Sequence, residues 1–251
     1  MEHRINILGV HVSAINMDQA LEILGGWLSR REPHYVCVTP AHVVMDGYWN
    51  PQLRPILNGS GLTTPDGMSI VWLLKLHGFP RAGRVCGTDL MNEVCSASDL
   101  RSRRHFLYGG APGVADALAD RLRTRFPGIQ IAGTYTPPFR PLTDTEDRAV
   151  VERINASRAD IVWIGISSPR QDTWMAEHLG KIDAPVMVGV GAAFDFLSGR
   201  KRQAPRWIQR IGLEWLFRLA SEPRRLWRRY AQYPLFVLLV LLQVLGITRY
   251  D

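Results

Sequence analysis

Short apolar bursts along the chain alternate with longer segments in which apolar residues recur every three or four positions. The bursts are rich in β-branched and aromatic residues and are bounded by Gly or Pro, which is typical of strands in a parallel sheet. The longer segments place charges between their apolar positions, as amphipathic helices do. The pattern therefore predicts an α/β fold of repeated strand–helix units. The predicted strands are 34–39, 105–110, 129–135, 160–165 and 185–191, and the clearest predicted helices are 113–126, 144–157 and 170–182.

The N-terminal stretch INILGVHVSAI predicts a pair of strands, followed by a first helix from about Met17 to Ser29. This end of the chain lacks the basic region, long apolar stretch and cleavage site of a secretory signal. The whole chain has three cysteines, Cys37, Cys86 and Cys95. They are too few and wrongly spaced for a disulfide framework or a structural zinc site. These features together favour a reducing, cytoplasmic setting.

The composition changes near the C-terminus. Between Gly199 and Tyr230 the chain has ten Lys or Arg against two Glu, a net charge of +8, whereas the whole chain carries +7 and residues 1–198 carry −1. We therefore predict a core domain at 1–198 and a basic C-terminal appendage at 199–251.

Within the appendage an apolar stripe recurs every four residues, at Trp207, Ile211, Trp215 and Leu219. Such a stripe is most often core or interface, but arginines surround this one, which favours association with an anionic membrane surface over a purely soluble basic face. The 13 apolar-rich residues at 235–247 contain a glutamine and fall short of the roughly 20 needed to span a bilayer. We expect that tail to lie in an interface or to fill a groove.

A glycine pair, Gly109 and Gly110, follows the predicted strand at 105–110 and precedes a helix. A turn of this kind aims backbone N–H groups at a phosphate-sized anion. A dinucleotide site is not expected, because Tyr108 replaces the first glycine of that motif and the next strand does not end in an acid. A nucleotide phosphate and a bare turn without a ligand both remain open for this segment.

Two further strand ends carry polar groups that could face a ligand, because ligands of open α/β sheets gather at the carboxyl edge. In GISSPRQDTW, Gln171 is either a ligand-facing amide or part of a solvated first helical turn capped by a serine; its spacing favours the second. After the last strand, Gly189 and Gly191 leave room for a ligand, and Asp195 either binds it or pairs with Arg200 or Arg202. The ion pair is the simpler alternative.

Asp66 lies between Pro65 and Gly67, just before an apolar run. It is either a cap for a helix beginning near Met68 or a reactive carboxylate at a strand end. If its segment and the strand ending at Thr39 reach the same sheet edge, then Thr39, Asp66 and Gln171 would line one pocket. No His-x-x-His, cysteine cluster or Asp-x-Asp accompanies them, so we expect no metal site and expect arginines to stabilise any diphosphate.

Five segments in order resemble the WecG/TagA/CpsF glycosyltransferases over about residues 5–230: TTPDGMSIVW, RVCGTDLM, FLYGGAPGVA, GISSPRQDTWMAEH and the long run from GVGAAFDFLSGRKRQAP to LWRRY. The resemblance implies a Rossmann-like sheet with helices on both faces. It also implies a metal-independent, inverting hexosyltransferase that needs no cofactor beyond its donor. This enzyme would move a sugar from a UDP-sugar to a polyprenyl-diphosphate-linked acceptor in cell-envelope or exopolysaccharide biosynthesis.

The same resemblance assigns roles to particular residues. It places the catalytic base on Asp66, with Thr39, Arg84 and Gln171 as the other catalytic residues. The nucleotide-sugar would be bound by glycines, an aromatic residue, an acid and the arginines of the appendage. These donor-binding residues are Gly109, Gly110, Tyr135, Gly189, Gly191, Asp195, Arg218, Arg224, Arg225 and Arg228.

The resemblance further implies an appendage that meets the membrane. We expect a peripheral or monotopic enzyme at the cytoplasmic face of the inner membrane, without nucleic acid as a partner and compatible with a homo-oligomer. Many family members read Thr-Pro-Asn where this chain has Thr39-Pro40-Ala41-His42. Either His42 takes over a sugar contact or the acceptor sugar differs. The tail after Tyr230 is expected to lie beyond the family's usual core.

Two alternatives of other classes remain on this evidence. The basic, Trp-rich window could track the phosphates of a nucleic acid, which predicts steeply salt-dependent binding without sugar transfer. A non-catalytic membrane scaffold would retain its function when Asp66 is changed to Asn. The sequence names neither the donor sugar, the acceptor glycan nor the oligomeric state.

Overall fold

The computed structural model describes residues 3–250. Contacts within the chain divide it into two units, each assembled from segments that are distant in sequence. The first unit contains residues 3–17, 38–86 and 203–250, and the second contains 18–37 and 87–202. The functional division predicted at residues 198 and 199 stays a prediction.

Six strands form one sheet in the order β4-β3-β8-β7-β5-β6. Every pairing from β3 across to β6 is parallel, so the carboxyl ends of these strands share one edge. The predicted α/β class and all five predicted strands are confirmed. The strands are β3 (His34–Thr39), β4 (Leu62–Pro65), β5 (Arg104–Gly109), β6 (Gln130–Tyr135), β7 (Ile161–Gly165) and β8 (Val186–Gly189).

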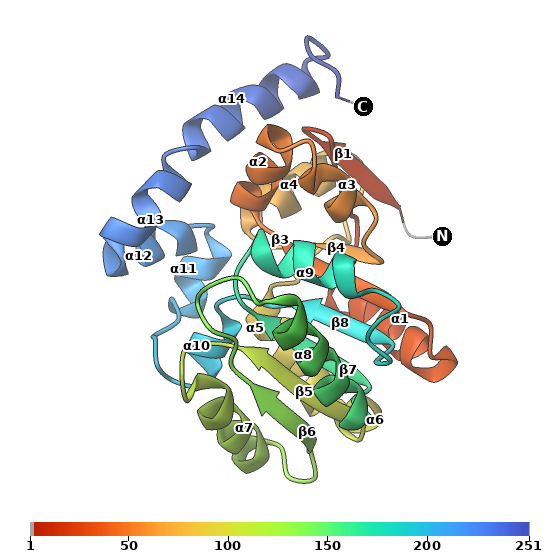
Figure 1. The fold of residues 1–251 in the computed structure, drawn as a ribbon. Coiled ribbons are helices and arrows are strands. Elements are labelled where there is room, and N and C mark those ends of the chain that lie inside the picture. Colours follow the sequence, from red (N-terminus) through yellow and green to blue (C-terminus); the bar gives the residue numbers. More distant parts are fainter. Residues whose placement is uncertain (1–2, 251) are drawn as a thin grey trace. The chain divides into compact units, whose positions relative to one another are not determined.

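Helices flank the strands of the second unit. Figure 1 shows α8 and α9 in front of the strands, with α5 and α6 fainter behind them. The central strand β7 is apolar at successive positions, and Val162, Trp163 and Ile164 are fully buried, as expected for a strand covered on both faces. The helices of this unit are α1 (Met17–Arg30), α5 (Gly87–Ser96), α6 (Ser98–Arg101), α7 (Val114–Arg125), α8 (Asp144–Ala156), α9 (Arg170–His178) and α10 (Ala193–Leu197).

The predicted helices of this unit are confirmed, with one difference in length. Helix α9 was predicted to run to residue 182 but ends at His178. Leu179 adopts an extended conformation and Gly180 has a φ of +83°, a conformation that only glycine adopts without strain. The chain therefore leaves the helix one turn early.

The first unit contains an antiparallel hairpin, and this confirms the predicted N-terminal strand pair. Arg4 fastens the hairpin by donating to the backbone carbonyls of Asn58, Ser60 and Gly61. The elements of the first unit are β1 (Arg4–Ile7), β2 (Val10–Ser13), α2 (Ala41–Trp49), α3 (Leu53–Asn58), α4 (Met68–Leu76), α11 (Arg206–Arg210), α12 (Glu214–Ser221), α13 (Pro223–Tyr230) and α14 (Tyr233–Val244), together with β4.

The apolar stripe of the appendage is divided between two helices. Trp207 lies on α11 and Trp215 on α12, with Gly212 between them at a φ of +77°. A Cβ at Gly212 would lie 3.0 Å from Cη2 of Trp72 and 3.2 Å from Cβ of Met68, so this turn packs closely on α4. The absence of a side chain at Gly212 permits that contact.

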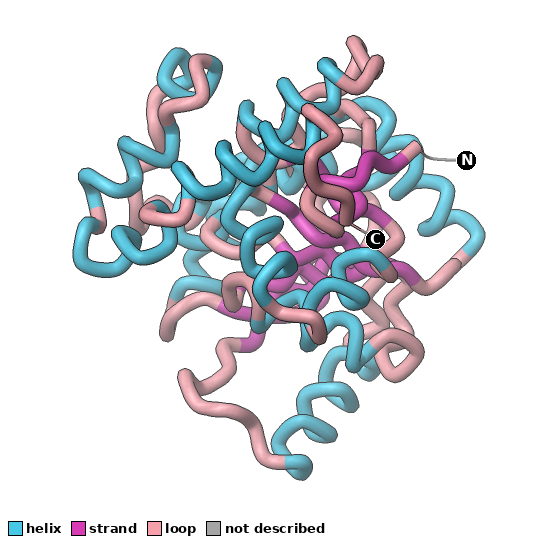
Figure 2. Tube along the Cα trace, turned by 90° about the horizontal axis from the view of Figure 1, so that it is seen from above, coloured by secondary structure: helices cyan, strands magenta, loops and turns pink. Residues whose placement is uncertain are grey.

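The apolar tail forms α14, which has one packed face and one exposed face. Phe236 and Val240 are buried, and α14 contacts α2. The Gln243 side chain accepts from the backbone N–H of Leu8 and donates to the carbonyl of Asn6, and Figure 2 shows the C-terminal end beside a strand of this hairpin. Among residues 3–250, no helix is long and apolar enough to cross a membrane.

Candidate active site

Asp66 directly follows β4 and precedes α4. Its backbone N–H donates weakly to the carbonyl of Thr39, at 3.4 Å, so the ends of β3 and β4 meet here. The position before α4 is taken by Gly67, and no side chain caps that helix. The Asp66 Oδ1 instead accepts from Arg84 Nε at 3.4 Å. Of the two sequence alternatives, the helix cap is therefore wrong.

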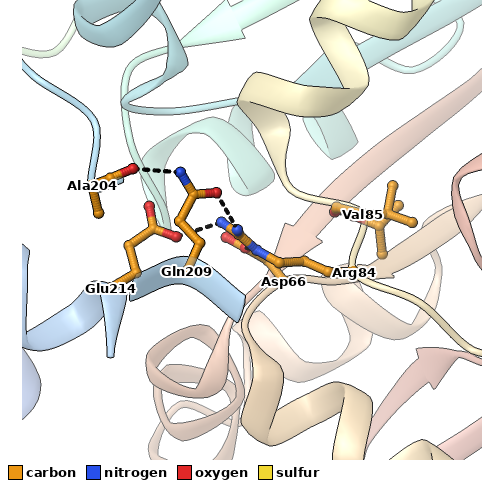
Figure 3. A network of polar contacts seen from close by, with 7 residues as sticks. Asp66, Arg84, Val85, Ala204, Gln209 and Glu214 are labelled. Atoms are coloured by element: carbon orange, nitrogen blue, oxygen red, sulfur yellow. Dashed lines mark hydrogen bonds and ion pairs between the residues drawn. The ribbon is translucent and has the colours of Figure 1, made fainter. Parts of the chain in front are cut away.

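Arg84 is held by three side chains (Figure 3). Besides its contact with Asp66, Nη1 donates to Gln209 Oε1 at 2.7 Å and Nη2 donates to Glu214 Oε2 at 2.5 Å. Gln209 is fixed in turn, because its amide donates to the carbonyl of Ala204 at 2.6 Å. Only 14% of the Arg84 side chain and 19% of the Glu214 side chain are exposed, so this pairing is largely shielded from water.

The backbone around Asp66 and Arg84 is fixed independently of their side chains. Thr64 donates its hydroxyl to the carbonyl of Val85 at 3.0 Å, and the Val85 N–H donates to the carbonyl of Pro65 at 2.8 Å. These bonds tie the end of β4 to the segment that carries Arg84. At Gly67 the φ is +88° and an added Cβ would meet no atom within 4 Å, so there is open space next to the acid.

A cluster of aromatic residues lies in the same unit, with His42 and Tyr230 buried and Trp215 and Tyr233 partly exposed. His42 is in the first turn of α2, and its ring meets that of Tyr230 edge-on with centroids 6.5 Å apart. Tyr230 and Tyr233 contact each other and Trp215. The sequence did not indicate this cluster, because its members come from α2, α12, α13 and α14.

Charges of both signs shift the pKa values of this cluster. Burial lowers the pKa of His42 well below its usual value, and the positive charges of Arg229 and Arg218 lower it further. Burial raises the pKa of Tyr233, the negative charge of Asp66 raises it too, and Arg218 and Arg229 oppose this shift. The electrostatic fields of Arg218, Arg229 and Asp66 therefore all reach this cluster.

The four arginines predicted on the appendage do not all share this environment. Arg218 does, but the structure adds Arg229, which the sequence did not single out. On α13, Arg225 pairs with Glu222 and Arg228 lies over the ring of Trp227, while Arg224 is exposed. Arg229 and Tyr230 escaped prediction because four arginines on one short helix cannot be told apart by composition.

In the second unit, a set of glycines lines the carboxyl edge of the sheet. A Cβ at Gly109 would lie 2.6 Å from the backbone carbon of Gly165, and Gly110 N–H donates to the Gly165 carbonyl at 3.0 Å. Gly110 has a φ of +76°. Close packing against Gly165 therefore explains why glycines occupy these two positions. This explanation neither requires nor excludes a bound phosphate.

Gln171 is 2% exposed, so the expectation that it lies on a solvated helical turn is wrong. Its Oε1 accepts from the Gly191 N–H at 3.1 Å, and its Nε2 donates to Ser168 Oγ at 3.3 Å. A Cβ at Gly189 would lie 2.9 Å from Nε2 of Gln171, so the glycine makes room for this amide. Gln171 belongs to the second unit, and its grouping with Thr39 and Asp66 stays a prediction.

The two other predicted donor-binding residues of this unit have identifiable partners. Asp195 forms an ion pair with Lys201 at 2.9 Å, which corrects the expected pairing with Arg200 or Arg202. Tyr135, at the end of β6, stacks on Tyr108 with ring centroids 5.9 Å apart, and the Arg153 guanidinium lies 5.4 Å from its ring centroid. Within residues 3–250, no group of three or more His, Cys, Asp or Glu is placed to hold a metal ion.

Comparison with known proteins defines the class of enzyme. Residues 5–250 match the model of the glycosyl transferase WecG/TagA/CpsF family. This match includes the tail, so the expectation that the tail lies beyond the family core is wrong. The chain belongs to the WecG/TagA/CpsF family and is a glycosyltransferase.

Several relatives share one name, N-acetylglucosaminyldiphosphoundecaprenol N-acetyl-beta-D-mannosaminyltransferase. The protein from Bacillus spizizenii is 31% identical over 215 residues, covering 86% of this chain and 81% of the relative. The protein from Bacillus subtilis is 29% identical over 187 residues, covering 74% and 70%. The protein from Staphylococcus aureus strain MW2 is 25% identical over 236 residues, covering 93% and 91%.

Proposed function

We propose that this chain transfers a sugar, with inversion, from a UDP-sugar to a polyprenyl-diphosphate-linked acceptor. The family and the named activity of its relatives support this class of donor and acceptor. The observation that carries the proposal is the placement of Asp66. Its carboxylate lies beside open space, and the contact with Arg84 orients it. The resemblance predicts Thr-Pro-Asn where this chain has Thr39-Pro40-Ala41-His42, so we do not transfer the relatives' sugar specificity.

In the proposed mechanism, Asp66 accepts the proton of the acceptor hydroxyl as that oxygen attacks the anomeric carbon. The bond to UDP breaks on the opposite face of the sugar, so a single displacement inverts the configuration. Negative charge then develops on the leaving diphosphate, and guanidinium groups and backbone N–H groups stabilise such charge. We assign that role to Arg218, and the donor-binding role of Gly109 and Gly110 stays a prediction. The proposal involves no metal ion.

We also propose that the appendage holds the enzyme on the cytoplasmic face of the plasma membrane. An apolar helix face next to basic residues binds anionic bilayer surfaces. Here Arg224, Arg225 and Arg228 are exposed on α13, and α14 has an outward apolar face. The exposed apolar residues of these two helices and of the turn that follows are Trp227, Val237, Leu238, Leu241, Val244, Leu245 and Ile247.

The test is a transfer assay with a panel of UDP-sugars and polyprenyl-diphosphate-linked mono- and oligosaccharides. The product is detected by mass, and its anomeric configuration is assigned by NMR. We expect one acceptor to gain one hexose unit with inverted configuration, both with and without a metal chelator. Release of UDP that requires no acceptor, or a product that retains the donor configuration, would refute the proposal.

A further inference from the structure

His42 is a buried imidazole with an unsatisfied nitrogen. The residue is 7% exposed, and its Nδ1 has no hydrogen-bond partner anywhere in residues 3–250. Buried polar side chains nearly always have a partner, because an unpaired donor or acceptor lowers the free energy of unfolding. A polar atom that is left unpaired in the protein alone is a candidate for a contact with a ligand.

Two other buried histidines have partners within the protein. The Nδ1 of His105 accepts from Trp163 Nε1 at 3.0 Å, although its Nε2 is unpaired among the described residues. His178 is 2% exposed, and both of its ring nitrogens are paired, Nδ1 with the carbonyl of Trp174 at 2.7 Å and Nε2 with Asp147 at 3.0 Å. No such partner satisfies the Nδ1 of His42 within residues 3–250. The contrast argues that His42 is not retained for internal hydrogen bonding.

The surroundings of His42 favour an anionic ligand. The residue lies in the first turn of α2, a nine-residue helix whose N-terminal end carries partial positive charge. The positive charges of Arg218 and Arg229 also act on this imidazole. A neutral N–H donor at a helix N-terminus, in the positive field of two arginines, suits the oxygens of a phosphate.

The same cluster lies within the electrostatic range of the candidate base. His42 follows Thr39 by three residues, and the Thr39 carbonyl accepts from the Asp66 N–H at 3.4 Å. Tyr230 contacts the His42 ring. Burial raises the pKa of Tyr230 and of Tyr233, and the negative charge of Asp66 raises both further. Both proposed substrates carry a diphosphate within one sugar of the reacting centre. We propose that His42 binds substrate directly, its Nδ1–H donating to an oxygen of a diphosphate that Arg218 and Arg229 hold beside Asp66. This inference rests on the proposed function for the identity of the substrates.

The first test compares thermal stability with binding of inorganic pyrophosphate, measured by calorimetric titration. His42→Leu removes the unpaired nitrogen at similar volume, so we expect a melting temperature equal to or above that of the wild type. We expect pyrophosphate to bind about tenfold more weakly or worse, because a hydrogen bond to a charged group is lost. The control His178→Leu should lower the melting temperature, since it leaves Asp147 and the Trp174 carbonyl without their partner.

A second variant separates the loss of a donor from a change in packing. His42→Asn keeps an N–H donor and should recover part of the affinity that His42→Leu loses. The inference is overturned if His42→Leu binds pyrophosphate like the wild type, or if the wild type itself shows no saturable binding. It is also overturned if Asn and Leu weaken binding equally while both lower the melting temperature as His178→Leu does.

Titrations with two further ligands show whether His42 contacts the diphosphate of the donor or that of the acceptor. UDP represents the donor, and farnesyl diphosphate represents the lipid acceptor. The ligand whose affinity falls in His42→Leu identifies the substrate that His42 contacts, and a fall for neither contradicts the proposal. These titrations need no turnover, so they remain decisive if the chain proves to transfer no sugar.

Discussion

Arg84 carries one positive charge and faces two carboxylates, those of Asp66 and Glu214. The shorter contact is the one to Glu214, which comes from the C-terminal segment. Because Arg84 is mostly buried, its position depends on these partners, and the orientation of Asp66 depends on Arg84. We therefore treat Glu214 and Gln209 as positioning residues, which act on the chemistry through Arg84.

At this scale we predict that Glu214→Gln lowers kcat/KM by about tenfold, since an ionic partner of Arg84 is replaced by a neutral one of the same shape. The effect should fall mainly on kcat, and adding Arg84→Lys should cost less in the Glu214→Gln background than in the wild type. Glu222→Gln is the matched control, because Glu222 is the other acid of the basic window and pairs with Arg225. Equal activities of the two glutamine variants would contradict the positioning role.

The residues alone supplied Thr39 and Asp66 as candidates, because each stands at an expected strand end. Arg84 came only from the resemblance to the family. The sequence could not supply Gln209 and Glu214. These residues are 125 and 130 positions from Arg84, and no local pattern encodes a contact of that range. The only available signal was that Glu214 is one of two acids in a window of ten basic residues.

At the scale of elements, strands and helices followed from periodicity wherever a segment was buried on both faces, as β7 is. The appendage was harder, because its four-residue stripe predicts one helix where Gly212 produces two. The stripe therefore does not form one face. The exposed apolar surface lies mainly on α14, whose buried positions Phe236 and Val240 alternate with Val237, Leu238 and Leu241.

We predict that the protein binds vesicles containing phosphatidylglycerol more tightly than vesicles of phosphatidylcholine alone, and that salt weakens this binding. Changing both Leu238 and Leu241 to Ser should lower the partition coefficient by about tenfold or more, because less apolar area enters the interface. Phe139→Ser is the control, since Phe139 is 80% exposed but lies in the other unit. Co-sedimentation with vesicles measures the partition coefficients of the wild type, the double variant and Phe139→Ser. Unchanged partitioning of the double variant would exclude α14 as the contact.

At the scale of the molecule, the residues predicted to be catalytic or donor-binding fall in both units. Asp66, Arg84 and the appendage arginines belong to the first, and Gly109, Gln171 and Tyr135 to the second. The fold class was predictable because alternating strands and helices leave few topologies for a parallel sheet. The discontinuous first unit was not, since it unites the N-terminal hairpin with the last 48 described residues, 203–250, through contacts such as Gln243 with Asn6.

We propose that this chain transfers a sugar with Asp66 as the base. The most direct test is the single-turnover rate of Asp66→Asn, with saturating UDP-sugar and acceptor, beside the wild type and Asp120→Asn, whose side chain is 76% exposed. We predict that Asp66→Asn is slower by roughly two to four orders of magnitude while its donor affinity is retained, and that Asp120→Asn matches the wild type. A rate for Asp66→Asn within about threefold of the wild type would contradict the account.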